Sequence, residues 1–191
     1  VYKRQVIGGY VRDIFLNRPS KDIDVVAVGS GIELAKRVAK KIGRGAYLSV
    51  FKNFGTAQVK AGDLELEFVG ARKESYSHDS RKPVVEDGTL EDDQNRRDFT
   101  INALYYDPVT EQVYDYHNGL KDLAQRRLRI IGSASERYRE DPVRMMRATR
   151  IAGKLGLSIE PATKKPIIQM AELLRNVPAA RLFDEMMKLF T

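Results

Sequence analysis

The spacing of apolar residues changes along the 191-residue chain, and this change predicts two regions of different architecture. In the first region, short apolar runs rich in β-branched residues and bounded by turn residues predict strands. These runs lie at residues 5–7, 23–28, 47–51, 56–60 and 65–69. Apolar positions spaced three and four apart predict helices at 11–16 and 32–42. The first region is therefore predicted to combine a sheet with helices.

The second region is predicted to be helical, because after about residue 132 every segment carries a helical pattern. The breaks between these helices fall at Gly156, Pro161 and Pro178. Residues 71–95 are polar, show no period and form a stretch too long for a passive connector. We place the boundary near residue 125, which gives an α/β head over 1–125 and a helical extension over 126–191.

The net charge of +7 comes from the second region. Residues 1–125 balance 19 basic with 19 acidic residues, whereas residues 126–191 hold 14 basic and seven acidic ones. Such a distribution is typical of a protein in which one part faces a polyanion such as nucleic acid. A helical bundle with solvated basic faces would explain the same charge, so the charge leaves both interpretations open.

Composition narrows the class of protein further. No run approaches the roughly 20 apolar residues needed to span a bilayer, so no membrane partner is expected. The chain has no cysteine and no cationic-then-apolar leader, which predicts a reducing compartment, the cytoplasm. Because it opens just before its first motif and stops within an apparent helix over 181–190, we expect it to be part of a longer protein.

Two carboxylates, Asp22 and Asp24, stand at the start of an apolar run. Side chains alternate along a strand, so both project from one face, with Cα atoms about 6.6 Å apart. They can therefore converge on one or two Mg²⁺ ions, which prefer carboxylate and phosphate oxygens. Glu67, on a strand whose alternation turns Leu66 and Phe68 inward, offers a third carboxylate. An isolated pair of this kind is also common on ordinary surfaces, and Glu67 alone fits a solvated strand residue equally well.

The segment 8–13, Gly-Gly-Tyr-Val-Arg-Asp, has the residues of a phosphate-binding turn. Gly8 and Gly9 permit close approach of the backbone to a phosphate, and Arg12 offers a planar donor for it. Together with the two carboxylates, this segment indicates a site that moves a nucleoside phosphate under the control of a divalent metal.

A second cluster is the segment 96–103, Arg-Arg-Asp-Phe-Thr-Ile-Asn-Ala, which follows the acidic residues 91–93. Arg96 and Arg97 are placed to clamp a triphosphate, and Asp98 to accept a ribose hydroxyl. The same residues also fit an acid-capped helix start in which the arginines pair with the acidic residues.

A third cluster spans residues 139–150. Asp141 ahead of Pro142 predicts a helix N-cap with proline at the first helical position. Arg144, Arg147 and Arg150 then recur every three residues as a ridge. The opposing apolar stripe comprises Met145, Ala148, Ala152 and Leu155. Such a ridge beside a cap carboxylate can hydrogen-bond the edges of a base, whereas a solvated basic face is the simpler alternative.

In this order the motifs resemble those of the class II tRNA nucleotidyltransferase and poly(A) polymerase family, from Ile7 to about Leu189. The resemblance implies an α/β (α+β) nucleotidyltransferase head with a mixed sheet, followed by an all-helical neck that reads the incoming base without a template. It also implies a two-metal Mg²⁺ site, RNA and chiefly the 3′ end of tRNA as acceptor, and ATP and CTP as donors. The stretch 71–95 matches a flexible loop that helps to switch nucleotide.

The resemblance further assigns roles to single positions. Asp22 and Asp24 match the metal-binding pair, and Glu67 matches a further acidic strand residue of the catalytic set. Gly9, Arg12 and Arg97 match contacts to the nucleotide, and Asp98 matches a residue near its sugar. Asp141 and Arg144 match the pair that hydrogen-bonds the base of CTP or ATP. Arg147 and Arg150 match further nucleotide contacts.

Several reactions of the family share these motifs. Residues 54–59 resemble the CCA-adding version of their strand, whereas residues 140–144 and 178–182 resemble poly(A) polymerase. We therefore predict CCA addition to tRNA, with poly(A) tailing as the alternative, and A-only or CC-only addition would look nearly the same. A small-molecule adenylyltransferase would leave the basic extension unexplained, and an RNA-binding module without catalysis would leave the carboxylates unexplained.

Overall fold

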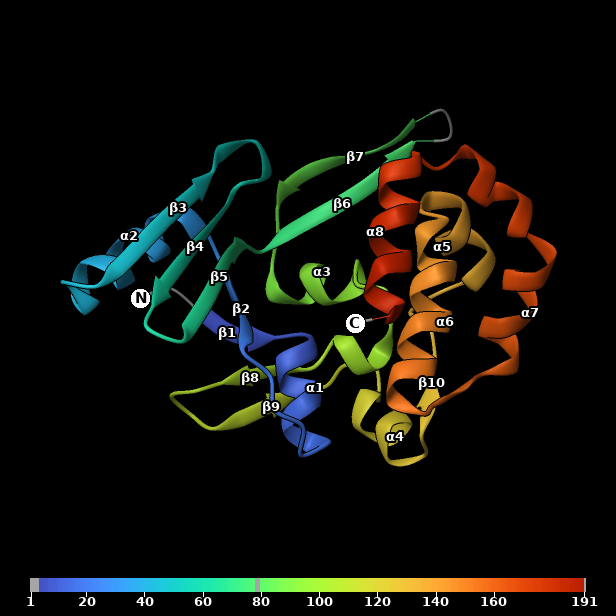
Figure 1. Cartoon of the computed structure of the whole chain (residues 1–191), viewed down its shortest axis with the longest axis horizontal. Helices are drawn as coiled ribbons and strands as arrows, with labels where there is room; N and C mark the ends of the chain where they lie inside the picture. Colours follow the sequence, from blue (N-terminus) through green and yellow to red (C-terminus); the bar gives the residue numbers. More distant parts are fainter. Residues whose placement is uncertain (1–3, 78–79, 191) are drawn as a thin grey trace. The chain divides into compact units, whose positions relative to one another are not determined.

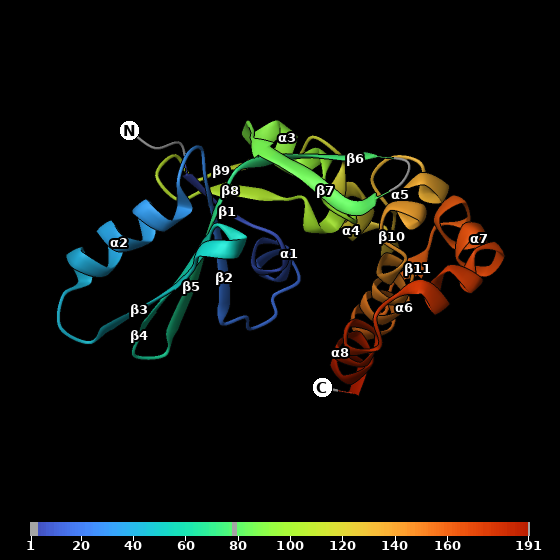
Figure 2. The same ribbon diagram turned by 90° about the horizontal axis from the view of Figure 1, so that it is seen from above.

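The computed structural model describes residues 4–77 and 80–190. The chain divides into two compact units. The first comprises residues 1–75, 84–97 and 102–116, and the second comprises residues 76–83, 98–101 and 117–191. Figures 1 and 2 show the elements of both units.

The first unit is built on a mixed sheet whose described strands follow the order β3-β4-β5-β2-β1-β8-β9. They are β1 (Arg4–Ile7), β2 (Asp22–Ala27), β3 (Ala46–Phe51), β4 (Thr56–Ala61), β5 (Leu64–Gly70), β8 (Tyr105–Asp107) and β9 (Gln112–Tyr114). Strands β2 and β5 run parallel, and the other neighbouring pairs are antiparallel. The remaining elements are α1 (Gly9–Phe15), α2 (Gly31–Ile42), η1 (Lys52–Phe54) and α3 (Leu90–Asn95). The predicted strands and helices over 5–69 are confirmed to within two residues.

Helix α2 covers one face of the sheet, because its apolar stripe meets the inward residues of neighbouring strands. Leu34 and Ala35 of α2 form a buried cluster with Ala27, Ala57 and Phe68. Figures 1 and 2 both show α2 alongside β3 and β4. Since side chains alternate along each strand, the opposite face of β2, β4 and β5 carries the intervening residues, which are mostly polar or charged.

The stretch 71–95 has regular structure, which corrects the expectation of a loop without a period. β6 (Arg72–Ser77) and β7 (Ser80–Asp87) form a two-stranded sheet of their own, and α3 follows it. Thr89 and Asp92 close a capping box at the start of α3, each side chain accepting from the other's N–H group. A separate two-stranded sheet needs no continuous apolar face, so its sequence carries little of the alternation that marks a buried strand.

The second unit is mainly helical. Its described helices are α4 (Gly119–Ala124), α5 (Ala134–Glu140), α6 (Val143–Leu155), α7 (Pro161–Gln169) and α8 (Ala179–Phe190), with the 3-10 turn η3 (Ala171–Asn176). The 3-10 turn η2 (Thr100–Asn102) begins in this unit and ends in the first, which includes Asn102. β10 (Arg127–Leu128) pairs in parallel with β11 (Ser158–Ile159), which corrects the expectation that every segment after residue 132 is helical. A two-residue strand is too short to leave a periodic signal in the sequence.

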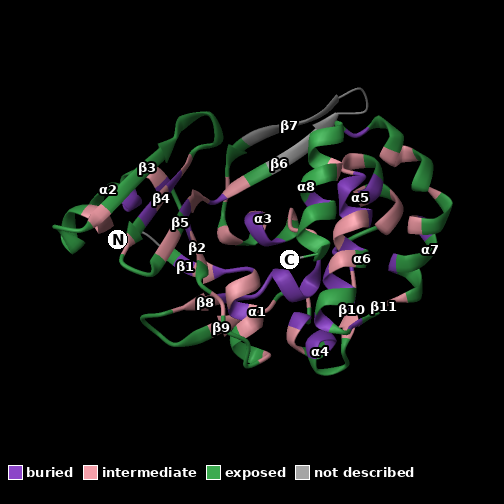
Figure 3. Ribbon diagram, viewed as in Figure 1, coloured by how far each residue is buried: buried purple, intermediate pink, exposed green. Residues whose placement is uncertain are grey.

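Helix α6 carries the apolar stripe of this unit. Met145, Ala148, Ala152 and Leu155 are buried, as predicted. Helix α8 lies beside α6, and Figure 3 shows that most of α8 is exposed. Among the helices of the described ranges, none is both long enough and apolar enough to cross a membrane.

Candidate active site

The register of the sheet brings the predicted carboxylates onto one face of the first unit. Asp24 lies opposite Glu67 and Asp22 lies opposite Glu65, because β2 and β5 pair in parallel. Phe68 is buried with the α2 cluster on the other face, as the alternation predicted. Neighbouring strands are about 4.8 Å apart, so Asp22, Asp24 and Glu67 line one short stretch of the sheet.

Asp24 is the half-buried member of this set, whereas Asp22 and Glu67 are exposed. Burial raises the pKa of Asp24 to about 6; the charge of Arg97 opposes this rise, and the carboxylates of Glu67 and Asp22 add to it. In the described part of the chain, no three acidic, histidine or cysteine side chains are grouped so that they could hold a metal by themselves. Two carboxylates nevertheless fit Mg²⁺, which is usually held by one or two of them together with phosphates and water.

We expect the charge on Asp24 to destabilise the metal-free protein. Because the folded-state pKa is raised, the folded protein keeps a proton that the unfolded chain, with a pKa near 3.8, has already lost. In EDTA, the free energy of unfolding of the wild type should therefore fall relative to that of Asp24→Asn as the pH rises from about 4 to about 6. The difference between the two proteins should grow by up to about 3 kcal/mol over this range and stay constant at higher pH. Urea unfolding across this range measures the effect, with Asp63→Asn in an exposed turn as the control. A difference in the free energy of unfolding between Asp24→Asn and the wild type that does not change with pH would contradict this prediction.

Gly8 forms a turn that glycine alone adopts without strain. It lies between β1 and α1 with φ +76° and ψ −138°. A Cβ at this position would lie 3.5 Å from Arg97 Nη1 and 3.5 Å from Asp24 Oδ2, and a Cβ at Gly9 would lie 3.3 Å from Arg12 Nη2. The two glycines thus leave space beside one carboxylate and two guanidinium groups, as a phosphate-binding turn requires.

Two partners fix the side chain of Arg12. Its Nε and Nη2 both lie 2.8 Å from Asp13 Oδ1, and its Nη1 donates to Asn102 Oδ1 at 2.7 Å. Asn102 is buried. A role for Asn102 is not predictable from the segment 96–103, because an uncharged amide in a sequence does not indicate which residue it contacts.

The adjacent arginines Arg96 and Arg97 pair with one fully buried carboxylate, Asp93. Asp93 Oδ1 accepts from Arg96 Nε at 2.8 Å, and Asp93 Oδ2 accepts from Arg97 Nη2 at 3.1 Å. The alternative in which these arginines pair with the preceding acidic residues is therefore confirmed. Arg97 also reaches the space beside Gly8, whereas a triphosphate clamp formed by both arginines stays a prediction.

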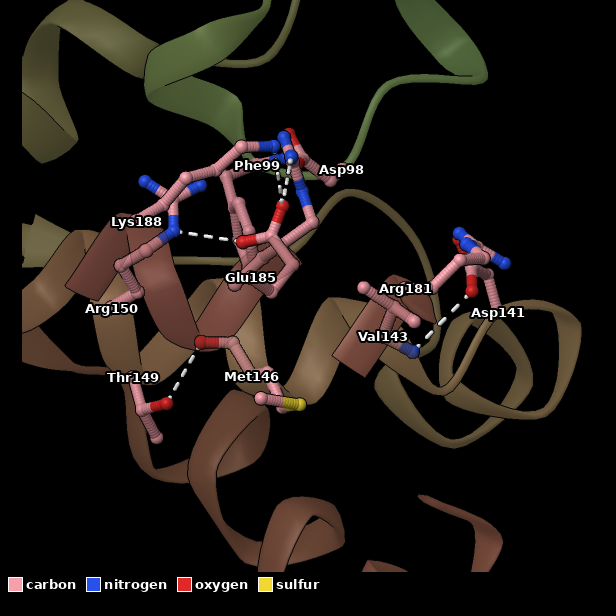
Figure 4. Close-up of polar contacts among 11 residues, drawn as sticks. Asp98, Phe99, Asp141, Val143, Met146, Thr149, Arg150, Arg181, Glu185 and Lys188 are labelled. Carbon is pink, nitrogen blue, oxygen red and sulfur yellow. Dashed lines mark hydrogen bonds and ion pairs between the residues drawn. The ribbon is translucent and has the colours of Figure 1, made fainter. Parts of the chain in front are cut away.

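In the second unit, α6 and α8 meet at a cluster of charged side chains (Figure 4). Arg147 Nε donates to Asp98 Oδ2 at 2.8 Å, and Arg150 Nε donates to Glu185 Oε2 at 2.8 Å. Burial acts to raise the pKa of Glu185, but the hydrogen bond from Arg150 and the charges of Arg147 and Arg150 hold it below its usual value. Glu185 was not among the predicted site residues, because a single carboxylate in an amphipathic helix has no distinguishing sequence pattern.

Arg144 departs from the predicted basic ridge. Its side chain is buried on the same side of α6 as Met145 and Ala148. Its Nη1 donates to Glu140 Oε2 at 2.8 Å and to the carbonyl oxygen of Arg137 at 3.0 Å. Positions three residues apart are turned by about 60° around a helix, so residues 144 and 150 point about 120° apart. The alternative of one solvated basic face is therefore wrong.

Helix α6 begins later than predicted. Pro142 is its N-cap residue, and Asp141 closes α5 instead. The Asp141 carboxylate still serves the start of α6, since its Oδ1 accepts from the Val143 N–H at 3.3 Å. Its Oδ2 accepts from Arg181 Nη2 at 2.9 Å. Figure 4 shows the contact between Val143 and Asp141. The Asp141 carboxylate therefore keeps part of the predicted capping role, although Pro142 is the N-cap residue.

The predicted site residues thus fall into two sets, one in each unit. The first unit holds Gly8, Gly9, Arg12, Asp22, Asp24, Glu67 and Arg97. The second unit holds Asp98, Asp141, Arg144, Arg147 and Arg150.

The mixed sheet, the glycine turn and the paired carboxylates are features of a nucleotidyltransferase. Residues 4–129 match the family model of the poly(A) polymerase head domain. Residues 156–191 match the model described as a probable RNA- and SrmB-binding site of polymerase A. The chain therefore belongs to the poly(A) polymerase head-domain family, and the resemblance predicted from the sequence is confirmed.

Curated relatives carry the names of several RNA-tailing proteins. The chain is 37% identical over 195 residues to poly(A) polymerase I of Haemophilus influenzae, covering 98% of the chain and 43% of the relative. It is 40% identical over 185 residues to the A-adding tRNA nucleotidyltransferase of Aquifex aeolicus, covering 94% of the chain and 22% of the relative. It is 38% identical over 191 residues to the CCA-adding enzyme of Streptococcus uberis, covering 99% of the chain and 46% of the relative. The chain thus spans less than half the length of these relatives.

Solved structures agree with the fold. A tRNA nucleotidyltransferase complexed with a primer tRNA and an incoming ATP analogue is 37% identical with a TM-score of 0.84, over 97% of this chain and 52% of that one. The Bacillus stearothermophilus CCA-adding enzyme in complex with CTP is 31% identical with a TM-score of 0.82, over 98% and 44%. The predicted nucleotidyltransferase fold is confirmed.

Proposed function

We propose that this protein is a template-independent RNA nucleotidyltransferase that adds CMP and AMP from CTP and ATP to the 3′ end of tRNA. The observation that carries the proposal is the similarity, over 97% of the chain, to a tRNA nucleotidyltransferase solved with primer tRNA and an ATP analogue. Residues 1–125 act as the catalytic head and residues 126–191 as the nucleotide-recognising neck. A cytoplasmic location remains part of the proposal.

In the head, Asp22 and Asp24 hold Mg²⁺, and Glu67 completes the catalytic set. Bound Mg²⁺ supplies activation of the primer 3′-hydroxyl and neutralisation of the leaving pyrophosphate in a two-metal scheme. The raised pKa of Asp24 supports this role, because a carboxylate that is costly to ionise alone is stabilised by a neighbouring cation.

The triphosphate is held by the glycine turn and two arginines. Gly8 and Gly9 admit it close to the backbone, and Arg12 and Arg97 neutralise its charge. Both guanidinium groups are already oriented by protein partners, so binding requires little further ordering of these side chains. Positioning and charge neutralisation carry most of the rate of phosphoryl transfer.

Gly8→Ala is expected to raise the KM for nucleotide about tenfold or more, because the added Cβ fills the space beside Arg97 and Asp24. Gly43→Ala is the matched control, since Gly43 has nearly the same backbone conformation, φ +79° and ψ −134°, with nothing within 4 Å of an added Cβ. Backbone strain of about 1–3 kcal/mol should lower the melting temperature of both variants. Steady-state kinetics with ATP and CTP should separate them, and an equal KM in the two would contradict the role of Gly8.

In the neck, Asp141 and Arg144 hydrogen-bond the base of CTP or ATP. A carboxylate accepts from the exocyclic amine of either base and a guanidinium donates to a ring nitrogen, so this pair suits both nucleotides. Arg147 and Arg150 make further nucleotide contacts, and Asp98 lies near the sugar. The contact between Arg147 and Asp98 supports a shared role for these two residues.

Two other tailing reactions are favoured by specific relatives. Poly(A) tailing is favoured by the 37% identity to poly(A) polymerase I over 98% of the chain. Addition of a single adenosine to tRNA is favoured by the 40% identity to an A-adding tRNA nucleotidyltransferase.

Sequencing of extended RNA ends separates these reactions. The full-length protein and Mg²⁺ are given CTP, ATP or both, with tRNA transcripts ending before CCA or after CC and with an unstructured RNA. Two cytidines and one adenosine followed by a stop would support CCA addition. One adenosine on the CC-ending tRNA alone would indicate an A-adding enzyme, and long adenosine tails on every RNA a poly(A) polymerase. RNA binding that is independent of Mg²⁺, with no incorporation, would overturn the proposal.

A further inference from the structure

Tyr105 has a buried hydroxyl that the proposed function does not use. It is the first residue of β8, lies opposite Ile7 of β1 and is fully buried. Its hydroxyl accepts from Arg97 Nε at 2.8 Å and donates to the Asp93 carboxylate. Arg97 also lies over the Tyr105 ring, with its Cζ 5.4 Å from the ring centroid. One tyrosine therefore contacts both members of an ion pair.

Asp93 contacts the same edge of the guanidinium as Tyr105, because Arg97 Nε donates to both side chains. Its Oδ2 accepts from Arg97 Nε at 3.3 Å and from Arg97 Nη2 at 3.1 Å. Burial acts to raise the pKa of Asp93, but the charges of Arg97 and Arg96 hold it below its usual value. The carboxylate is therefore ionised at neutral pH and forms a charge-assisted contact, which is stronger than a neutral hydrogen bond.

These contacts fix the direction of the third nitrogen of Arg97. Nε and Nη2 face Asp93 and Tyr105, while Nη1 lies 3.5 Å from the position of a Cβ on Gly8. A guanidinium is planar, so holding two of its nitrogens sets where the third one points. An arginine without such contacts would have to be ordered each time an anion bound, at a cost in side-chain entropy.

We propose that Tyr105 is a positioning residue that, together with Asp93, aims Arg97 Nη1 at the phosphates bound beside Gly8. This inference rests on the proposed function, in which Arg97 contacts the triphosphate. Tyr105 acts through Arg97 and does not touch the nucleotide. Its hydroxyl therefore sets the affinity for the triphosphate and for the pyrophosphate product, and not the affinity for the RNA primer.

Tyr105→Phe tests this directly, because it removes the hydroxyl and keeps the ring. In the full-length protein with Mg²⁺, we expect the KM for nucleotide and the inhibition constant for pyrophosphate to rise together by about tenfold, the size of a lost hydrogen bond to a charged group. The KM for primer RNA and kcat at saturating nucleotide should change little. Tyr138→Phe is the matched control, since Tyr138 is also fully buried and its hydroxyl donates to the Thr163 carbonyl oxygen at 3.1 Å.

Both tyrosine variants lose a buried hydrogen bond and should lose stability, so assays are run below the melting transitions of both. A rise confined to Tyr105→Phe would support positioning, whereas equal kinetics in the two variants would overturn it. Arg97→Lys lacks the Nε that Tyr105 and Asp93 contact. Adding Tyr105→Phe to Arg97→Lys should therefore raise the KM for nucleotide no further. An additive rise would show that Tyr105 does not act through Arg97.

Asp93→Asn provides a second route if Tyr105→Phe does not fold. It removes the charge of the carboxylate that also holds the Arg97 guanidinium, and it should raise the KM for nucleotide and the inhibition constant for pyrophosphate by the same factor. An unchanged KM for nucleotide and an unchanged inhibition constant for pyrophosphate in Asp93→Asn would contradict the positioning of Arg97 by Tyr105 and Asp93. Failure of the proposed function is distinguishable, because the wild-type protein would then incorporate no nucleotide at all.

Discussion

Asp24→Asn is expected to lower nucleotide incorporation by a factor of about 10³ or more, comparable to the loss of a principal electrostatic group from an active site. Asparagine keeps the size of the side chain but removes the charge that holds Mg²⁺. Single-turnover extension of a tRNA primer at saturating Mg²⁺ measures the loss. Circular dichroism and the urea transition should show an intact fold, because removing a half-buried charge does not weaken packing.

Glu65→Gln is the matched control for this loss. Glu65 lies opposite Asp22 on the same face of the sheet, but its carboxylate is engaged by Lys60 and Gln58. Incorporation by Glu65→Gln should stay close to that of the wild type. Near-wild-type turnover in Asp24→Asn, or an equal loss in both variants, would remove the metal-site assignment.

Arg144→Ala is expected to change which nucleotide is incorporated. The kcat/KM for CTP and ATP should fall about 100-fold, as for a lost hydrogen bond from a charged group, while UTP and GTP fall less. The Mg²⁺ dependence of the remaining activity should be unchanged, because Asp22 and Asp24 lie in the other unit. Competition among the four nucleotides on one primer, read by sequencing, measures the selectivity.

Arg139→Ala serves as the control for Arg144→Ala, since Arg139 is an exposed arginine of the neighbouring helix α5. It should leave both rate and selectivity unchanged. Since Arg144 also contacts Glu140 and the backbone of Arg137, its loss can lower stability, and melting temperatures are compared first. A uniform loss for all four nucleotides in Arg144→Ala would indicate a positioning role and not base recognition.

Much of the fold is predictable because its signals are local. The apolar runs that become β2, β4 and β5 and the stripe that becomes α2 are visible within windows of a dozen residues. The stretch that becomes β6 and β7 lacked this signal, because its strands pair only with each other. Burial of Arg144 was also not predicted, because its side chain pairs with Glu140 of the preceding helix α5, and that contact forms only in the tertiary structure.

The site is predictable only where chemistry and spacing coincide. The Asp22 and Asp24 pair is such a case, because two residues of one strand share a face whatever the tertiary structure. The partners that orient the arginines come from distant parts of the chain: Arg12 and Asn102 are 90 residues apart, and Arg150 and Glu185 are 35 apart. Each of these partners is a common residue type, so composition alone cannot mark them.

The repeated passage of the chain between the two units constrains how this protein can recombine with its relatives. Residues 98–101 belong to the second unit and pair there with 129–131, through Thr100 N–H to Arg129 O at 3.0 Å and Ile131 N–H to Asp98 O at 2.9 Å. A chimera joined at residue 125 would combine 98–101 of one parent with 129–131 of the other. A functional chimera should therefore take residues 98–101 and residues 129–131 from the same parent. Recombination points inherited during evolution should likewise lie outside residues 98–131.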